Sequence, residues 1–364
     1  MRPLVPLLAC LVLPLASARA TTVRVAVASG PSLTITGHDL VARSSPDAPA
    51  IAFGRRVRLT SVGPFVSDGQ LLTPTLSVAD RSGARLEVGG VGLLGAVEVV
   101  ATDRTLYAID RVELETYVAS VVGGEMPPSW PMQALEAQAI AARTYVLARR
   151  LAATHAPYDV DAGVLSQVYR GAGSLDPRTV AAAQATKGVV VTWHGALADT
   201  YFFASCTGRT ESARAAFGTA APYLVPTSCQ GGEGAPLAHW TRRLTIGPLS
   251  RALEKAGAIG GRLRGIVVTR RTKTGRIARA RLVTGRGARV VRGAELRRLV
   301  GYSALPSLDA TVAMDGGEVV FTGSGSGHGV GLCQWCARGR ALAGDSAARI
   351  LARAYPGTRL SPLP

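Results

Sequence analysis

The segment Pro131–Ala153 constrains the fold most, because its apolar residues recur at the spacing of a single helical face. That face consists of Leu135, Ala139, Ala142 and Val146. Pro131, which follows Ser129 closely, is typical of the first turn of a helix. The many alanines favour close packing by neighbouring elements. We therefore expect a long, Ala-rich helix in this part of the chain.

Short β-prone pieces precede this helix and recur after it. Between Thr22 and about Tyr107, Gly, Pro, Ser and Asp separate strand-like runs such as VRVAVA and LTIT. Residues Arg264–Val291 alternate like an antiparallel meander with Thr-Gly turns. The expected fold class is α+β, with a small β-rich lobe over residues 21–107. A mixed domain over residues 108–364 follows, with a β-meander subregion at about 241–300.

The first twenty residues have the pattern of a signal peptide. Arg2 precedes an apolar core, Leu4–Leu15, and Ala18-Arg19-Ala20 suits cleavage after about Ala20. The apolar run is short for a membrane span. We expect a secreted protein of the periplasm or cell envelope that does not span the membrane. Lipidation at Cys10 is the alternative, since Leu7-Leu8-Ala9-Cys10 resembles a lipoprotein box.

The formal net charge is +17, and most of the basic residues are arginines spread along the chain. Such a charge raises the question of nucleic acid, but export argues against it, and Arg264–Arg298 alternates as strands with no recognition helix. An arginine-rich surface outside the cytoplasm suits anionic wall polymers or peptidoglycan carboxylates. The alternative is a solvated basic face with no dedicated partner. We expect no nucleic-acid partner.

Four cysteines remain once the signal peptide is removed, an even number in a compartment where disulfides persist. They are Cys206, Cys229, Cys333 and Cys336. Their number allows three pairings, and the C-x-x-C spacing of Cys333 and Cys336 also suits redox sites and metal knuckles. Disulfides are the favoured interpretation.

Three polar islands interrupt otherwise apolar sequence: GGEMPPSW, YFFASCTGRTE and GSGSGHGVGLCQW. Glu125, in the first, is expected in a loop just before a helix N-terminus. The helix dipole there would favour the carboxylate anion, whereas a general acid needs its protonated form stabilised in an apolar pocket. Met126 and Trp130 are the candidates for that pocket. The alternative is a glutamate that caps the helix.

Taken together and in this order, the islands resemble the SpoIID/LytB family of sporulation and cell-wall proteins. The resemblance covers nearly all of Val112–Leu360. It rests on Glu113–Val118, GGEMPPSWPMQALEAQAIAARTYVLA, Gln167–Gly171, Ala185–Gly188, Gly208–Glu211, GSGSGHGVGLCQW, Ala337–Gly339 and Tyr355–Thr358. It implies a SpoIID-like mixed domain and a lytic transglycosylase that acts on glycan strands whose stem peptides an amidase has removed.

Glu125 falls on the family's catalytic glutamate. Ordinary glycosidases use two carboxylates, but here the C6 hydroxyl of the muramic sugar attacks, so one acid/base suffices and leaves 1,6-anhydroMurNAc ends. The alternative, suggested by the family name LytB, is a non-catalytic peptidoglycan-binding module that stimulates an N-acetylmuramoyl-L-alanine amidase. Peptidoglycan strands and such an amidase are the expected partners. Sporulation by the host is not implied.

Six further residues are candidates for contacts with substrate. They are Arg143, Tyr201, Ser205, Glu211, His328 and Gln334. Glu211 is the nearest rival or assistant of Glu125, and its alternative is an ion pair with Arg143. Arg143 itself suits a buried ion pair equally well, and Tyr201 suits a core position. His328 and Gln334 suit the substrate side of the site rather than the acid.

Several family members bind zinc through a histidine and two cysteines before the Gln-x-Tyr-x-Gly segment. His155 is retained here, but Ser166 stands where a ligand cysteine would precede Gln167. Without thiolates a structural zinc site at that place is not expected. The resemblance therefore implies no cofactor. The four cysteines elsewhere are expected to converge as two disulfides or, alternatively, as a new metal cluster.

Overall fold

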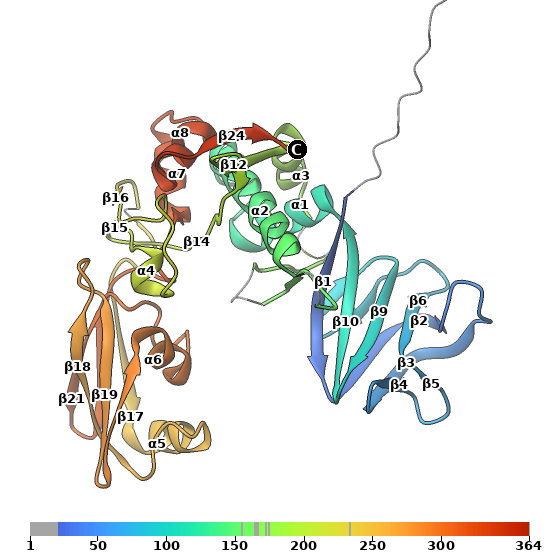
Figure 1. The fold of residues 1–364 in the computed structure, drawn as a ribbon, viewed down its shortest axis with the longest axis horizontal. Helices are drawn as coiled ribbons and strands as arrows, with labels where there is room; N and C mark the ends of the chain where they lie inside the picture. The colour runs from blue at the N-terminus through green and yellow to red at the C-terminus, as the bar shows by residue number, and fades with distance from the viewer. Residues whose placement is uncertain are drawn as a thin grey trace, which may run out of the picture.

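The computed structural model describes residues 21–153, 156–163, 167–171, 173, 175–232 and 234–363. Over these ranges the fold is mixed α and β, with eight helices and several sheets (Figure 1). The expected signal peptide and the two family zinc positions, His155 and Ser166, lie outside the described residues. No helix of the described part is long and apolar enough to cross a membrane.

The N-terminal lobe is a single twisted sheet. Its strands are β1 (Thr22–Gly30), β2 (Ser32–Arg43), β3 (Ile51–Val62), β4 (Phe65–Ser67), β5 (Leu72–Thr73), β6 (Thr75–Asp80), β7 (Leu86–Val88), β8 (Val91–Leu93), β9 (Ala96–Thr102) and β10 (Thr105–Glu113). A later strand, β11 (Val160–Asp161), joins the same sheet. The order is β11-β1-β10-β9-β6-β2-β3-β4-β5, with β7 paired to β2 and β8. Strand β10 pairs antiparallel with β1 and runs directly into the first helix, so the sheet fixes where that helix starts.

The helical part follows the N-terminal lobe in sequence and also contains the C-terminal elements of the chain. Its elements are α1 (Leu114–Glu125), α2 (Met132–Ala152), β11 (Val160–Asp161), α3 (Pro177–Ala185), β12 (Val189–Trp193), β13 (Ala196–Leu197), α7 (Gln334–Leu342), α8 (Ala347–Ala354) and β24 (Arg359–Pro362). Helix α2 is buried along most of its length, and α1, α3, α7 and α8 pack against it. Strand β24 pairs antiparallel with β12, which joins the end of the chain to the middle.

Helix α1 corrects an expectation from the sequence, because Glu125 was expected in a loop and instead belongs to this helix. The Glu113 side chain caps this helix by accepting from Thr116 N at 2.9 Å. The buried residues Leu114, Tyr117, Val118, Val121 and Val122 follow helical spacing. Gly123 and Gly124 are residues typical of turns, yet both lie inside the helix. At Gly124 the absence of a side chain permits a close contact with Val168.

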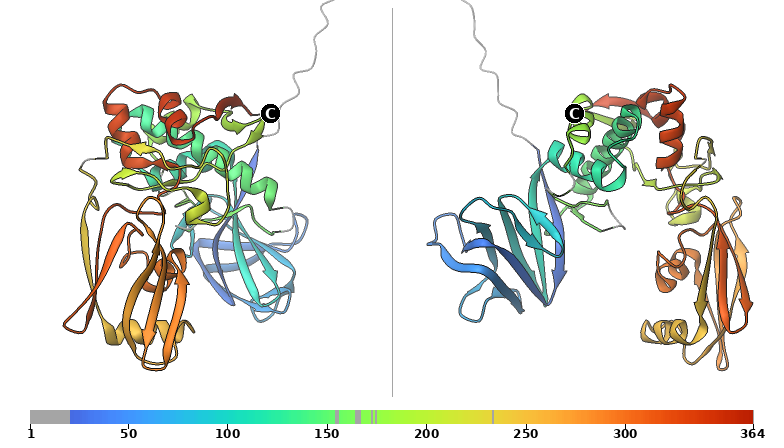
Figure 2. Two further views of the ribbon diagram at one scale, coloured as in Figure 1. Left: turned by 60° about the vertical axis from the view of Figure 1, so that its left-hand side comes forward. Right: turned by 180° about the vertical axis from the view of Figure 1, so that it is seen from behind.

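In sequence, a third lobe is inserted between the two halves of the helical part. It contains β17 (Trp240–Thr245), α5 (Ile246–Lys255), β18 (Leu263–Arg271), β19 (Ile277–Thr284), β20 (Gly287–Arg292), α6 (Gly293–Val300), β21 (Ala310–Asp315) and β22 (Glu318–Gly323). The expected antiparallel meander is present as β18-β19-β20. A separate core that includes Leu253 and Phe321 holds this lobe together. It and the N-terminal lobe project from the same side of the helical part (Figure 2).

Short irregular elements connect the third lobe to the helices. They are β14 (Phe202–Phe203), β15 (Gly208–Arg209), α4 (Ala213–Ala216), β16 (Ser228–Cys229) and β23 (Leu332–Cys333). Strands β14 and β23 pair in parallel, and β15 and β16 pair antiparallel. The second and third polar islands therefore lie side by side, although more than a hundred residues separate them in sequence.

Candidate functional site

Glu125 is the last residue of α1, not a residue of a loop before a helix N-terminus as the sequence predicted. Its Oε1 accepts a hydrogen bond from Val168 N at 2.9 Å, and its Oε2 accepts one from Gln334 Nε2 at 2.9 Å. The C-terminal end of a helix carries the negative end of the dipole, which disfavours a carboxylate. The helix dipole therefore favours the protonated form of Glu125, as a general acid requires, and not the anion.

The environment of Glu125 favours the protonated carboxyl. Burial raises the pKa of Glu125 above its ordinary value, while the Val168 amide, the Gln334 side chain and the charge of Arg170 act in the opposite direction. The effect of burial is the largest, so the pKa of Glu125 stays raised. A carboxyl of this kind retains a proton at a higher pH than an exposed glutamate, as a general acid requires.

The segment Gln167–Gly171 is fixed against α1 and positions the amide of Val168. Tyr117 donates its hydroxyl to Gln167 Oε1 at 2.5 Å, and Ser120 donates to the carbonyl of Gly171 at 3.0 Å. Tyr169 donates to Asp110 Oδ2 at 2.5 Å, which ties the segment to β10 as well. The sequence identified this segment only by resemblance, because no side-chain pattern reveals the role of a backbone amide.

Gly124 allows the backbone of Val168 to reach Glu125. A Cβ added at Gly124 would lie 2.3 Å from the carbonyl oxygen of Val168, far inside contact distance. Replacing glycine by alanine inside a helix normally stabilises by about 0.5–1 kcal/mol. At Gly124 we expect the opposite sign, a loss of about 1–3 kcal/mol as in other overpacked sites, measured by urea denaturation.

The control for this prediction is Gly247→Ala in helix α5. There the nearest atom to an added Cβ, Nη1 of Arg251, is 3.8 Å away, an ordinary contact. We expect that variant to be neutral or more stable. Equal effects of the two substitutions would show that the close approach at Val168 does not exist.

Gln334 is brought to Glu125 by the glycine-rich loop. This loop lies along the segment Tyr201–Cys206, and its glycines face that segment at very short range. A Cβ at Gly327 would lie 2.6 Å from Cβ of Phe203, and one at Gly331 would lie 2.1 Å from the carbonyl oxygen of Tyr201. Both glycines also have positive φ. A residue with a side chain would therefore be disfavoured by the backbone conformation as well as by the short contact. The loop therefore ends at a fixed point, where Gln334 begins α7.

His328 lies among aromatic rings and is not positioned as an acid. Its ring is 5.1 Å from that of Phe217, 5.6 Å from that of Phe203 and 6.1 Å from that of Tyr201, between centroids. Its Nδ1 accepts from Val330 N at 3.1 Å. Burial, together with the charge of Arg297, lowers the pKa of His328 to about 4, against a hydrogen bond with the Phe202 backbone. The imidazole is therefore neutral at pH 7.

Tyr201 and Ser205 lie on the segment Tyr201–Cys206, which contacts the glycine-rich loop. Glu211 follows this segment and donates its backbone N–H to the carbonyl of Gly329 in the loop at 2.7 Å. Tyr201 accepts from Arg149 Nη2 at 3.1 Å, and Ser205 exchanges backbone hydrogen bonds with Ser326. Glu211 is 2% exposed and accepts from Thr272 Oγ1 at 2.6 Å and from Thr274 Oγ1. Glu211 therefore links this segment to the third lobe, and the alternative ion pair with Arg143 is not formed.

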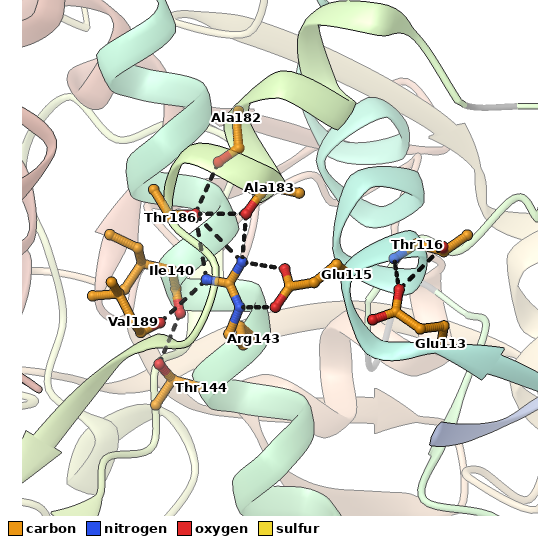
Figure 3. Close-up of polar contacts among 10 residues, drawn as sticks. All are labelled: Glu113, Glu115, Thr116, Ile140, Arg143, Thr144, Ala182, Ala183, Thr186 and Val189. Carbon is orange, nitrogen blue, oxygen red and sulfur yellow. Dashed lines mark hydrogen bonds and ion pairs between the residues drawn. The ribbon is translucent and has the colours of Figure 1, made fainter. Parts of the chain in front are cut away.

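Arg143 does not line the site. Its side chain is fully buried and forms a two-point ion pair with Glu115, with Nε–Oε1 at 3.0 Å and Nη2–Oε2 at 2.5 Å. It also donates to the carbonyls of Ala183 at 3.0 Å and Val189 at 3.1 Å (Figure 3). Arg143 therefore joins α1, α2, α3 and β12, which corresponds to the buried ion pair that the sequence analysis gave as its alternative.

An aromatic pair lies beside Gln334, and only one of its two residues, Trp130, was predicted from the sequence. Trp130 and Trp335 meet edge to face with centroids 5.1 Å apart, and the Arg338 guanidinium lies 5.3 Å from the Trp335 ring centroid. The sequence analysis proposed Met126 and Trp130 as apolar neighbours of Glu125, and both are buried. Trp335 and Arg338 were not predicted as members of this cluster, although Trp335 belongs to the CQW motif and Arg338 follows it three residues later.

The four cysteines gather at one place. Cys229 and Cys336 are joined as a disulfide, while Cys206 and Cys333 are free and buried. Two disulfides were expected, and a single bridge is formed within the described residues. Cys333 directly precedes Gln334 and Cys336 follows it two residues later, so the sulfur cluster neighbours the site that contains Glu125.

Comparisons with known proteins find related sequences. A family model described as stage II sporulation protein matches residues 102–193. An uncharacterised protein of Brachyspira hyodysenteriae is 32% identical over 275 residues, which cover 74% of this chain and 72% of the relative. Stage II sporulation protein D of Bacillus subtilis is 28% identical over 273 residues, 70% of this chain and 76% of the relative.

The amidase enhancer of Bacillus subtilis is 29% identical over 289 residues, which cover 66% of this chain and 40% of that relative. The family model lies over β10, α1, α2, α3 and β12, so it contains Glu125 and the amide of Val168. The chain belongs to the SpoIID/LytB family.

Proposed function

We propose that this protein acts in the cell envelope as an exported peptidoglycan lytic transglycosylase, with Glu125 as its single acid/base. The observation that carries the proposal is the environment of Glu125. Burial raises the pKa of this carboxyl, and one backbone amide and one side-chain amide hold its two oxygens. The substrate class is peptidoglycan glycan strands, stripped of stem peptides, and the bond cleaved joins MurNAc to GlcNAc.

Protonated Glu125 gives its proton to the glycosidic oxygen as the bond from that oxygen to the anomeric carbon breaks. The C6 hydroxyl of the same muramic sugar attacks the anomeric carbon and forms the 1,6-anhydro ring. Its proton returns to the Glu125 carboxylate. The proton count is balanced and no water is consumed. Val168 N and Gln334 Nε2 hold the carboxylate that exists between these two transfers.

A single acid/base is supported by the contacts of Glu211, the rival carboxylate that the sequence suggested. Glu211 is buried, and two threonine hydroxyls of the third lobe bind the same oxygen of its carboxylate. A glycosidase that uses water or an enzyme nucleophile needs a second carboxylate on the opposite face of the sugar. The intramolecular attack by the sugar hydroxyl needs none, and for this reason we favour it.

The second candidate function is a non-catalytic peptidoglycan-binding module that stimulates an amidase. It is favoured by the relative that is named amidase enhancer. In that case the groups around Glu125 would bind a strand without cleaving it. The two candidates separate when peptide-free strands are incubated with the protein and analysed by mass spectrometry. Anhydro ends support the enzyme, and intact bound strands support the module.

The pH dependence of cleavage tests the link between Gln334 and Glu125. Gln334 lowers the pKa of Glu125, so Gln334→Ala is expected to raise that pKa further. Activity requires the protonated acid, which is lost as pH rises through its pKa. We therefore expect the alkaline limb of the kcat/KM profile to move to higher pH in this variant.

The matched control is Gln133→Ala, which removes a similar hydrogen bond from Gln133 Nε2 to Glu136 Oε2 at 2.8 Å on helix α2. We expect its pH profile to coincide with that of the unchanged protein. An alkaline limb that stays in place in Gln334→Ala, or moves to lower pH, would contradict the role assigned to Gln334.

A further inference from the structure

The four cysteine sulfurs form a cluster built from separate segments of the chain. Cys206 follows β14, Cys229 ends β16, Cys333 ends β23, and Cys336 lies in α7. All four residues are buried, and their sulfur atoms all lie within 4.8 Å of one another. This arrangement brings a loop, two strands and a helix to one point.

The spacing of the sulfurs suits a tetrahedral metal ion. A zinc–sulfur bond of about 2.3 Å places neighbouring sulfurs of a tetrahedron roughly 3.8 Å apart. The sulfurs of Cys206 and Cys336 are 3.9 Å apart. Cys336 is also the residue bonded to Cys229, so its sulfur is close to sulfurs from two different segments at once. That is expected of a compact cluster rather than of isolated pairs.

The backbone around the sulfurs is arranged as in a metal knuckle. Cys333 is the residue that caps α7, and its sulfur accepts from Cys336 N at 3.4 Å, within the C-x-x-C turn. At Gly232 an added Cβ would lie 3.2 Å from the Cys336 sulfur, so a glycine leaves room beside the cluster. Thiolates are the ligands that zinc prefers in structural sites.

The four cysteines make up most of a small hydrophobic cluster of their own. This cluster contains Phe203 and the four cysteines, with Trp335 packed at its side. Aliphatic side chains do not contribute to that cluster within the described residues. In such small cores a bound metal supplies the free energy that apolar packing cannot.

A single disulfide accounts for only half of the cluster. The bridge between Cys229 and Cys336 leaves Cys206 and Cys333 as buried thiols in contact with it. In a compartment where disulfides persist, two adjacent thiols are expected either to pair or to bind a metal. A metal would take all four sulfurs as thiolates, and the bridge is then absent.

We propose that Cys206, Cys229, Cys333 and Cys336 form a tetrathiolate site for zinc. This site is distinct from the place before Gln167, where several family members bind zinc but where no zinc site is expected in this chain. A cavity of about 420 Å³, lined in part by Cys206, Cys229 and Gly232, gives an ion access from solvent. Because Cys333 directly precedes Gln334, the metal fixes the residue that holds Glu125.

The test uses the full exported chain, purified without chelators from cells supplied with zinc. Elemental mass spectrometry is expected to find about one zinc ion per chain, and intact mass under denaturing conditions is expected to match four reduced cysteines. After exchange with cobalt, a thiolate-to-cobalt charge-transfer band is expected. Iron in place of zinc would overturn the choice of metal. A metal-free chain that is lighter by two or four hydrogens, and so contains disulfides, would overturn the site.

Two substitutions of Cys206 separate metal binding from disulfide formation. Cys206→Ser is expected to weaken zinc binding by more than the roughly 10–100-fold that the loss of an outer-shell partner costs. Cys206→His is expected to retain zinc with an altered cobalt spectrum, because imidazole nitrogen is a zinc ligand but forms no disulfide. If the histidine variant binds zinc no better than the serine variant, the proposal is wrong. That result is independent of any glycan cleavage.

Discussion

Replacing Glu125 with glutamine is expected to lower the yield of anhydro-muramic ends by at least about 10²–10⁴-fold. An amide cannot give a proton to the leaving oxygen, and it cannot take one from the attacking hydroxyl. Glutamine has the same size and keeps one oxygen that can accept from Val168 N. In the unchanged protein this hydrogen bond to Glu125 is 2.9 Å long. We therefore expect glycan-strand binding to be retained within a few-fold, measured by co-sedimentation with peptide-free strands.

The matched control is Glu136→Gln. Glu136 lies on α2 and also accepts a hydrogen bond from a glutamine side chain, that of Gln133. Its replacement is expected to leave product yield almost unchanged. If Glu125→Gln retains substantial cleavage, or if both glutamines reduce it equally, Glu125 is not the acid/base.

Arg143→Ala is expected to destabilise the protein by about 3–5 kcal/mol, because it leaves the carboxylate of Glu115 buried without its partner. Arg143 is fully buried, and Glu115 is 4% exposed. The substitution also removes donors from the carbonyls of Ala183 and Val189 (Figure 3). The free energy of unfolding from urea titration measures the loss, at an unchanged denaturant slope.

Arg243→Ala is the control for a surface ion pair. Arg243 contacts Asp315 and Glu318, but its side chain is 53% exposed, so we expect its loss to lower the free energy of unfolding far less than the loss of Arg143 does. Changing Arg143 and Glu115 together to apolar residues is expected to recover part of the stability, because no unpaired charge remains. A loss below about 1 kcal/mol in Arg143→Ala would contradict the buried pair.

The sequence predicted elements whose periodicity is unbroken. The observed helix α2 lies one residue inside each end of the range expected from its apolar stripe, and the expected antiparallel meander is present as β18-β19-β20. Helix α1 was missed because Gly123 and Gly124 lie in its last turn, and glycines are typical of turns. The reason for Gly124 is its contact with Val168, which lies 44 residues further on and leaves no local signal.

The candidate site was predictable in its residues but not in its contacts. Glu125 and Gln334 were both selected, yet their hydrogen bond joins positions 209 residues apart in sequence. The alternation of glycines around His328 reflects the close approach of the segment Tyr201–Cys206, which no local pattern displays. For Arg143 the sequence left two roles open, because a buried arginine and a substrate-binding arginine look alike until their neighbours are known.

Cleavage of peptide-free strands in water labelled with heavy oxygen tests whether Glu125 breaks the glycosidic bond without water. Mass spectrometry then reports how each new muramic end was formed. The account predicts 1,6-anhydro ends that carry no heavy oxygen, because the sugar's own hydroxyl closes the ring. Reducing ends that contain one heavy oxygen would show hydrolysis, and strands that stay intact would show binding alone; either result would contradict the claim.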